Sequence, residues 1–171
     1  GCHFDKNTGA VRTPAGFREA YRQFVEAGWS GLTASAALGG QALPESIACV
    51  FKEMIDGANL SWGNYPLLSH GAVEALKHHG DTWQQQVFLK AIVEGRWTGT
   101  MCLTEPHCGS DLALLKTRAT PNADGSYAIS GTKIFITGGE HDLTENIVHL
   151  VLARLPDAPP GVKGISLFIV P

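Results

Sequence analysis

The apolar residues of this 171-residue chain change their spacing near Trp97, and this change limits the possible folds more than any other feature. Before Trp97, apolar positions recur at helical spacing, which is typical of amphipathic helices. After it, short apolar runs are separated by turn residues, which is typical of strands. Helices followed by strands predict an α+β fold with a mainly antiparallel sheet. We therefore expect a helical domain over residues 1–97 and a β-domain over residues 98–171.

The helical part predicts several separate helices. Thr13 is expected as the N-cap of the first helix, Pro14 as its first residue and Gly28 as its end. The second helix should open at Pro44, and a third is expected over residues 69–79. One face of the second helix carries Ile47, Val50, Phe51, Met54 and Ile55.

A fourth helix should be capped by Asp81, with Gln84 as its capping-box partner and Gly95 at its end. Its buried stripe is expected to be Val87, Phe88, Ala91 and Ile92. In the second part, residues 122–125 (NADG) predict a hairpin turn. The expected strands are residues 98–103, 116–120, 127–130, 133–137, 147–154 and 165–170.

Composition and charge exclude several classes of protein. The net charge is −3 and Lys and Arg are not clustered, so neither nucleic acid nor an anionic membrane surface is an expected partner. No apolar run approaches the length of a membrane span. The cysteine spacing fits no disulfide framework and the N-terminus has no signal-peptide pattern, so we expect reduced thiols and a cytoplasmic location.

The lack of an initiator Met, together with an end inside an apolar run, indicates an excerpt of a longer protein.

Two segments carry residues that could bind a ligand. Residues 104–111 (TEPHCGSD) could present amide and hydroxyl donors to an anionic group, although their composition alone favours an ordinary turn. In residues 133–139 (KIFITGG), strand alternation would place Phe135 and Thr137 on one face. An aromatic ring beside a hydroxyl could bind a planar heterocycle. The commoner interpretation of such a segment is a core strand that ends in a glycine turn and binds no ligand.

Together, the two segments resemble the acyl-CoA dehydrogenase family. The middle β-domain of that family carries a T-E-P-x-x-G-S-D loop and, after the separation seen here, a K-x-[W/F]-I-T-x-G strand. Further similarity lies in Gly28-Trp29, Gly39-Gly40, residues 66–68, Gly71 and residues 164–170. Residues 139–142, 146–149 and 155–161 are similar to the branch that contains 3-methylmercaptopropionyl-CoA dehydrogenases. The resemblance therefore covers nearly the whole chain and implies the family's fold, with a C-terminal helical domain missing.

The resemblance also implies a flavin site that binds FAD. The implied cofactor-binding residues are Met101, Leu103, Thr104, Gly109, Ser110, Phe135, Ile136 and Thr137. Thr104 is expected near the pyrimidine edge of the flavin, Thr137 near its N5 and Phe135 against the ring system. Gly109 and Ser110 are expected toward the pyrophosphate, with Ser110 also near the acyl-CoA substrate. Because both segments would contact one ring, they should converge in space.

The chain departs from the family pattern within these motifs. Many relatives have Trp where this chain has Phe135. The smaller Phe ring gives the expected contact with the flavin a smaller area. His107 and Cys108 replace a common Gly-Ala pair, which makes the conformation of this loop less predictable. The histidines show no metal-binding spacing, so no metal is expected.

The implied activity is α,β-dehydrogenation of an acyl-CoA thioester, which makes the complete protein an oxidoreductase of fatty acid metabolism acting on CH–CH bonds. In the family, a Glu of the C-terminal helical domain removes the α-proton, so no catalytic residue is expected in this chain, and Glu105 is not that base. The 171 residues alone should therefore be inactive. An electron-transfer flavoprotein is the implied electron acceptor, and a homo-oligomer is implied for the full-length protein.

Two alternatives stay open. An acyl-CoA oxidase-type flavoenzyme would share the fold and would differ in the reaction of its reduced flavin with oxygen. A non-catalytic flavin-binding relative that binds DNA would need a basic surface, which a net charge of −3 disfavours.

Overall fold

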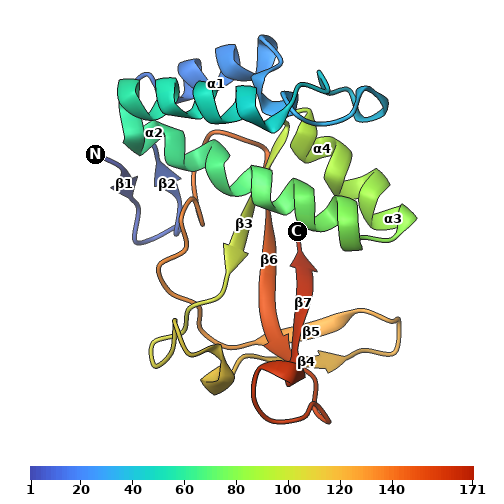
Figure 1. Cartoon of the computed structure of the whole chain (residues 1–171). Helices are drawn as coiled ribbons and strands as arrows, with labels where there is room; N and C mark the ends of the chain where they lie inside the picture. Colours follow the sequence, from blue (N-terminus) through green and yellow to red (C-terminus); the bar gives the residue numbers. More distant parts are fainter. The chain divides into compact units, whose positions relative to one another are not determined.

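The computed structural model describes residues 1–171 and confirms the α+β fold (Figure 1). The chain forms two compact units, each built from two stretches of sequence. The helical unit comprises residues 1–100 and 137–148, and the β unit comprises residues 101–136 and 149–171. The predicted domains, residues 1–97 and 98–171, are continuous stretches, whereas each unit combines two stretches. The domain boundary near Trp97 therefore stays a prediction.

The helical unit begins with a short hairpin of β1 (His3–Phe4) and β2 (Val11–Arg12). Its α-helices are α1 (Phe17–Glu26), α2 (Glu45–His79), α3 (Thr82–Gln84) and α4 (Lys90–Val93). Single turns of 3-10 helix form η1 (Trp29–Gly31) and η2 (Ala36–Leu38), and η3 (Gln85–Leu89) is a π-helical turn. Tyr21, Phe24 and Trp62 form the buried centre of an aromatic cluster in this unit.

The start of α1 differs from the prediction. The helix begins at Phe17, and Gly16 precedes it in a left-handed conformation, so Thr13 is not the N-cap. The hydroxyl of Thr13 instead donates a hydrogen bond to Asp142, a partner that local sequence cannot reveal. Gly28 ends the helix region in a left-handed conformation, as predicted.

The second and third predicted helices are joined into α2, which is broken at a single residue. Asn59 has extended backbone angles, and its side chain accepts a hydrogen bond from the backbone N–H of Trp62 at 3.1 Å. Asn59 therefore caps the second stretch of the helix. Of the predicted apolar face, Phe51 and Ile55 pack against the aromatic cluster. Ile47, Val50 and Met54 are exposed.

The fourth helix has the predicted cap but a shifted buried stripe. The Asp81 side chain accepts from the Gln84 N–H at 2.8 Å, and the Gln84 side chain accepts from the Asp81 N–H at 3.0 Å. The π-helical turn η3 then inserts an extra residue into the helical repeat. As a result Leu89 is buried, while Val87, which was expected in the stripe, is exposed.

The sheet contains β3 (Trp97–Cys102), β4 (Arg118–Pro121), β5 (Tyr127–Ser130), β6 (Asn146–Arg154) and β7 (Ile165–Val170), so five predicted strands are confirmed. The strand order is β3-β6-β4-β5, and β7 also pairs with β6. The pairs β4–β5 and β6–β7 are antiparallel, whereas β4 and β6 meet in parallel at one residue pair. The predicted turn at residues 122–125 closes the β4–β5 hairpin.

The sixth predicted strand, over residues 133–137, is wrong. These residues form no ladder, and Phe135 has a positive φ of 58°, which interrupts an extended backbone. The predicted alternation between Phe135 and Thr137 is therefore lost.

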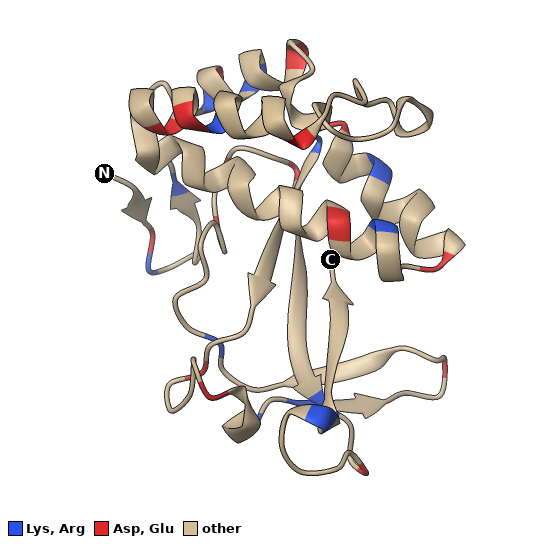
Figure 2. Cartoon of the chain, in the orientation of Figure 1, with Lys and Arg blue, Asp and Glu red and all other residues tan.

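The charged residues are not concentrated in one element of the fold. Lys and Arg are interspersed with Asp and Glu along the chain rather than gathered on one element (Figure 2). None of the helices combines the length and the apolar character that crossing a bilayer requires. All four cysteines are free.

Candidate functional site

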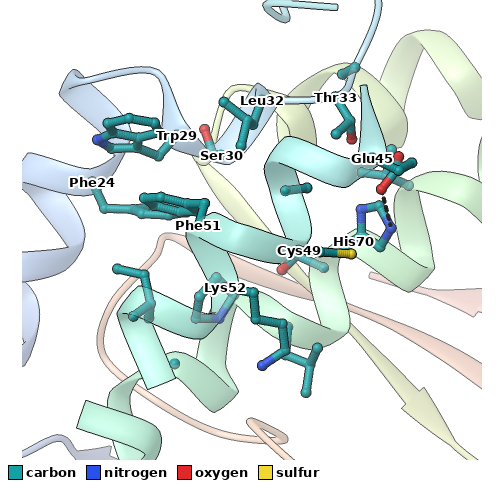
Figure 3. Close-up of a pocket in the computed structure, with 18 of the residues that line it drawn as sticks. Phe24, Trp29, Ser30, Leu32, Thr33, Glu45, Cys49, Phe51, Lys52 and His70 are labelled. Atoms are coloured by element: carbon teal, nitrogen blue, oxygen red, sulfur yellow. Dashed lines mark ion pairs between the residues drawn. The ribbon is translucent and has the colours of Figure 1, made fainter. Parts of the chain in front are cut away.

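A cavity of about 250 Å³ lies in the helical unit (Figure 3). Its wall includes Trp29 and Phe51, whose rings stack with centroids 4.4 Å apart. His70 lies 3.8 Å from Glu45 in an ion-pair arrangement at the same cavity. The lining is mostly apolar, and none of the predicted cofactor residues contributes to it. The cavity is therefore separate from the site that the motifs predict.

The T-E-P loop of the β unit closes on itself in a tight turn. The backbone N–H of Glu105 donates to the carbonyl of Cys108 at 2.8 Å, and the Cys108 N–H donates back at 3.1 Å. His107 Nε2 lies 3.1 Å from the carbonyl oxygen of Leu114, within hydrogen-bonding distance. The Asp111 side chain accepts from the N–H of Ala113, as its Asx-type position predicts.

Glu105 is the buried centre of this loop. Its Oε1 accepts from the Thr117 N–H at 2.9 Å, from the Thr117 hydroxyl at 2.5 Å and from Lys133 Nζ at 2.9 Å. Its Oε2 accepts from the Lys116 N–H at 2.8 Å. Only 3% of the Glu105 side chain is exposed. A buried charge of this kind requires such compensation by donors and an opposite charge.

The protonation of Glu105 follows from these contacts. Burial by itself raises the pKa of the carboxyl group, but hydrogen bonds from Thr117, Lys116 and Lys133 outweigh burial and lower the pKa to about 2. A carboxylate with so low a pKa and with its oxygens occupied is a poor proton acceptor at neutral pH. That Glu105 is not the catalytic base stays a prediction.

The second predicted segment lies beside this loop. Lys133 Nζ donates to the carbonyl of Leu103 at 3.0 Å as well as to Glu105, and the Ile134 N–H donates to the carbonyl of Thr104 at 2.9 Å. The predicted convergence of the two segments is therefore confirmed within the β unit. Phe135 follows directly, with 88% of its surface exposed.

The predicted cofactor residues occupy different environments. Met101, Leu103 and Thr104 are half-buried on β3 and the loop that follows it, and Gly109 and Ser110 are exposed on that loop. Phe135 is exposed and Ile136 half-buried on the neighbouring segment. These residues belong to the β unit, whereas Thr137 is an exposed residue of the helical unit. Their contacts with a flavin stay a prediction.

The residues of the β unit offer features that fit a flavin. A left-handed backbone conformation costs free energy at a bulky aromatic residue, and such strained residues occur preferentially at binding sites. Phe135 combines both properties. The loop beside it exposes the hydroxyl-bearing Ser110 and the neighbouring Gly109. A Cβ atom at Gly109 would lie 3.3 Å from Thr104 Cγ2, so glycine allows a close approach of the backbone here.

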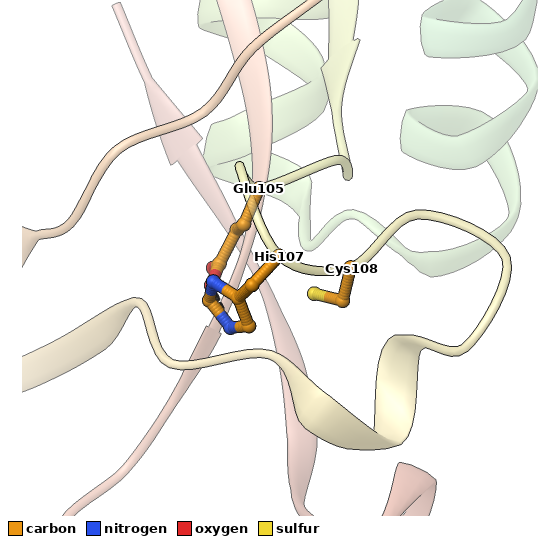
Figure 4. Close-up of side chains that lie close together, drawn as sticks. All are labelled: Glu105, His107 and Cys108. Atoms are coloured by element: carbon orange, nitrogen blue, oxygen red, sulfur yellow. Dashed lines mark ion pairs between the residues drawn. The ribbon is translucent and has the colours of Figure 1, made fainter.

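Glu105, His107 and Cys108 bring three possible metal-ligand atoms within 4.8 Å of one another (Figure 4). His107 Nε2 lies 3.5 Å from Glu105 Oε2. The Glu105 oxygens already accept the hydrogen bonds described above, including one from a cationic Lys133. Because a metal would have to displace these donors, the cluster is better explained as a loop anchor than as a metal site.

Sequence reasoning missed the roles of Thr117 and Lys133. Lys133 was visible as the first residue of the K-x-F-I-T motif, but nothing in the pattern showed that its side chain turns to Glu105. Thr117 belonged to a predicted strand and carried no motif. The separation of these residues along the chain explains the omission.

Comparisons with known proteins place this geometry in a family. Residues 6–96 match the N-terminal domain of acyl-CoA dehydrogenases, and residues 100–171 match the middle domain. The chain belongs to the acyl-CoA dehydrogenase family. The two matched ranges are the N-terminal and middle domains of this family, and a solved acyl-CoA dehydrogenase structure shares their fold.

Relatives at the level of individual proteins agree with this assignment. The chain is 53% identical to 3-methylmercaptopropionyl-CoA dehydrogenase of Ruegeria pomeroyi over 95% of its own length and 28% of that protein. It is 42% identical to the broad-specificity linear acyl-CoA dehydrogenase FadE5 of Mycobacterium tuberculosis over 98% of its length and 27% of that protein. The chain therefore spans less than a third of the length of these curated relatives.

Solved structures show the same architecture. The acyl-CoA dehydrogenase of Geobacillus kaustophilus superposes with a TM-score of 0.75 at 26% identity, over 90% of this chain and 39% of that one. The butyryl-CoA dehydrogenase of Megasphaera elsdenii superposes with a TM-score of 0.71 at 27% identity, over 98% of this chain and 40% of that one.

Proposed function

We propose that these residues supply the flavin-binding part of an FAD-dependent acyl-CoA dehydrogenase. The observation that carries the proposal is the hydrogen bond between Ile134 and Thr104, which brings the two flavin motifs together in the β unit. Thr104, Ser110 and Phe135 would hold the cofactor from these motifs. Bound FAD would accept the β-hydrogen of the acyl thioester as hydride.

The residues of this chain would bind and orient the cofactor, and none of them would be the base that removes the α-proton. Thr104 would hydrogen-bond the pyrimidine edge of the flavin, Phe135 would pack against its rings, and Thr137 would lie near N5. Gly109 and Ser110 would face the pyrophosphate and the acyl-CoA. The catalytic Glu is expected in a C-terminal helical domain, and an electron-transfer flavoprotein is expected to reoxidise the flavin. A cytoplasmic homo-oligomer is the expected state of the complete protein.

The substrate class is best supported as a short acyl-CoA thioester. Relatives in two organisms are named for 3-methylmercaptopropionyl-CoA and butyryl-CoA, and both thioesters have short acyl chains. The relative FadE5 is named for broad specificity on linear acyl chains. A short acyl panel that includes 3-methylmercaptopropionyl-CoA is therefore the first choice for assay.

The test is to purify the natural polypeptide that contains this sequence, to release its flavin and to identify it by chromatography. Dye reduction is then measured with the acyl-CoA panel, in parallel with a polypeptide of residues 1–171. We expect FAD and substrate-dependent turnover in the natural protein. The shorter polypeptide should lose at least the ~10²–10⁴-fold that a positioned base contributes. Release of FMN, absence of flavin, or equal turnover by residues 1–171 would contradict the proposal.

A further inference from the structure

A nearly buried cation joins the two flavin motifs. The Lys133 side chain is only 10% exposed, and its Nζ lies 2.9 Å from Glu105 Oε1 and 3.0 Å from the carbonyl oxygen of Leu103. The next residue, Ile134, donates its N–H to Thr104. Leu103 and the first two residues of the T-E-P loop are thus tied to two successive residues of the second segment.

The Glu105 carboxylate also accepts hydrogen bonds from Lys116 and Thr117. The Thr117 and Lys116 backbone N–H groups and the Thr117 hydroxyl fix both of its carboxylate oxygens. The carbonyl of Thr117 in turn accepts from the Arg154 N–H on β6 at 2.9 Å. The Arg154 side chain donates to the carbonyl of Leu115 at 2.9 Å. The sheet therefore determines where the Glu105 carboxylate lies, and Glu105 determines where Lys133 lies.

Phe135 has a backbone conformation that its own exposed side chain does little to stabilise. It has a φ of 58°, which a bulky side chain rarely adopts, and the side chain itself is too exposed for packing to hold it there. Strained backbone persists only where its surroundings fix it. The preceding residues, Lys133 and Ile134, supply the nearest fixed contacts.

We propose that Lys133 and Glu105 are positioning residues of the flavin site, whose buried ion pair holds Phe135 in its left-handed conformation against the loop that carries Thr104. The proposal rests on the proposed function, since it assigns a role toward the bound flavin. Removing either partner would leave the other charge buried and unpaired. The segment would then shift, and the aromatic face of Phe135 would leave its place beside the flavin.

The experiment uses the natural polypeptide and the variants E105Q, K133M and K133R. Glu74→Gln is the matched control, because Glu74 pairs with Lys77 at the protein surface. FAD is removed and titrated back to measure its dissociation constant, and visible circular dichroism of the saturated proteins reports the surroundings of the flavin. Hydrogen exchange of residues 131–137 in the apoprotein reports the segment without any flavin.

We expect E105Q and K133M to weaken FAD binding at least ~10-fold, to change the visible dichroism of the bound flavin and to accelerate exchange at Ile134. K133R keeps the charge and should retain most of the wild-type dichroism, and E74Q should match the wild type. If a variant does not fold, the pair T117V and T117S replaces it, because only T117S keeps the hydroxyl that donates to Glu105. T117V should then reproduce the effects in weaker form.

Different outcomes separate the two proposals. If the wild-type protein binds no FAD, the proposed function and the positioning role both fail. If the wild type binds FAD and the variants lose thermal stability while keeping its dissociation constant and dichroism, the ion pair is structural only and the positioning role alone is overturned.

Discussion

The hydroxyl of Thr13 donates a 2.6 Å hydrogen bond to Asp142 Oδ1, and the Thr13 backbone N–H donates to the same oxygen at 3.0 Å. The two residues are 129 positions apart, yet both belong to the helical unit. Partial burial raises the pKa of the Asp142 carboxyl, and the two bonds from Thr13 outweigh that effect and lower the pKa. This contact therefore fastens the 137–148 stretch to the N-terminus of the chain.

Replacing Thr13 with valine should destabilise the protein by about 1–2 kcal/mol, because it removes a hydrogen bond to a charged, partly buried acceptor while keeping the side-chain shape. Urea unfolding measures the change. Thr120→Val, at an exposed strand position, is the control and should change stability by less than about 0.5 kcal/mol. Equal effects of the two substitutions would refute the role given to Thr13.

The stability of the β unit should depend on pH through Glu105. Its pKa is about 2 in the folded chain, compared with an ordinary value of 4.5. A lowered pKa means that the stabilisation is fully present above pH 4.5 and is lost as the pH falls toward 2. The difference corresponds to about 3 kcal/mol. Unfolding measured over this range should show a steeper loss for the wild type than for E105Q, and parallel curves would contradict the assignment.

Gly131 should not tolerate a side chain. A Cβ atom there would lie 2.3 Å from the Thr117 hydroxyl oxygen, which donates to Glu105, so G131A should cost roughly 1–3 kcal/mol or more. Gly57, on α2, has open space around the corresponding position, so G57A should be neutral or stabilising. Thermal unfolding of the two variants distinguishes the cases, and a harmless G131A would show that the Thr117 contact is not as close as described.

Phe135→Gly should separate stability from flavin binding. Glycine adopts a positive φ without strain, and the exposed ring buries little surface, so the apoprotein should gain up to about 1 kcal/mol. Loss of the aromatic face should weaken FAD binding at the same time. Calorimetry of the apoprotein and FAD titration give the two values. A less stable apoprotein with unchanged FAD affinity would contradict both parts.

The sequence predicted those elements whose determinants are local. The strands over residues 127–130 and 165–170 were predicted with their observed bounds, and the Asp81 capping box was predicted from two residues three positions apart. In each case the pattern and the structure depend on neighbouring residues, so a single sequence contains enough information.

The failures involve contacts between distant residues. Thr13 resembled an N-cap, but its hydroxyl has a stronger partner in Asp142. The K-I-F-I-T segment had the composition of a strand, yet hydrogen bonds to the T-E-P loop hold it outside the sheet. In the candidate site, the resemblance pointed to both motifs, while the buried network around Glu105 became visible only with the structure.

The interleaving of the two units has a practical consequence for anyone who divides or recombines proteins of this kind. A cut after Thr100 would separate the first hundred residues from residues 137–148, although both belong to the helical unit. Such a piece would lack Asp142, the partner of Thr13, and Leu143, which packs against the aromatic cluster. A chimera made at that point would combine residues 1–100 of one protein with the 137–148 stretch of another. The helical unit would then be built from two different proteins. Exchanging the 137–148 stretch together with residues 1–100 would keep Asp142 with Thr13 and Leu143 with the aromatic cluster.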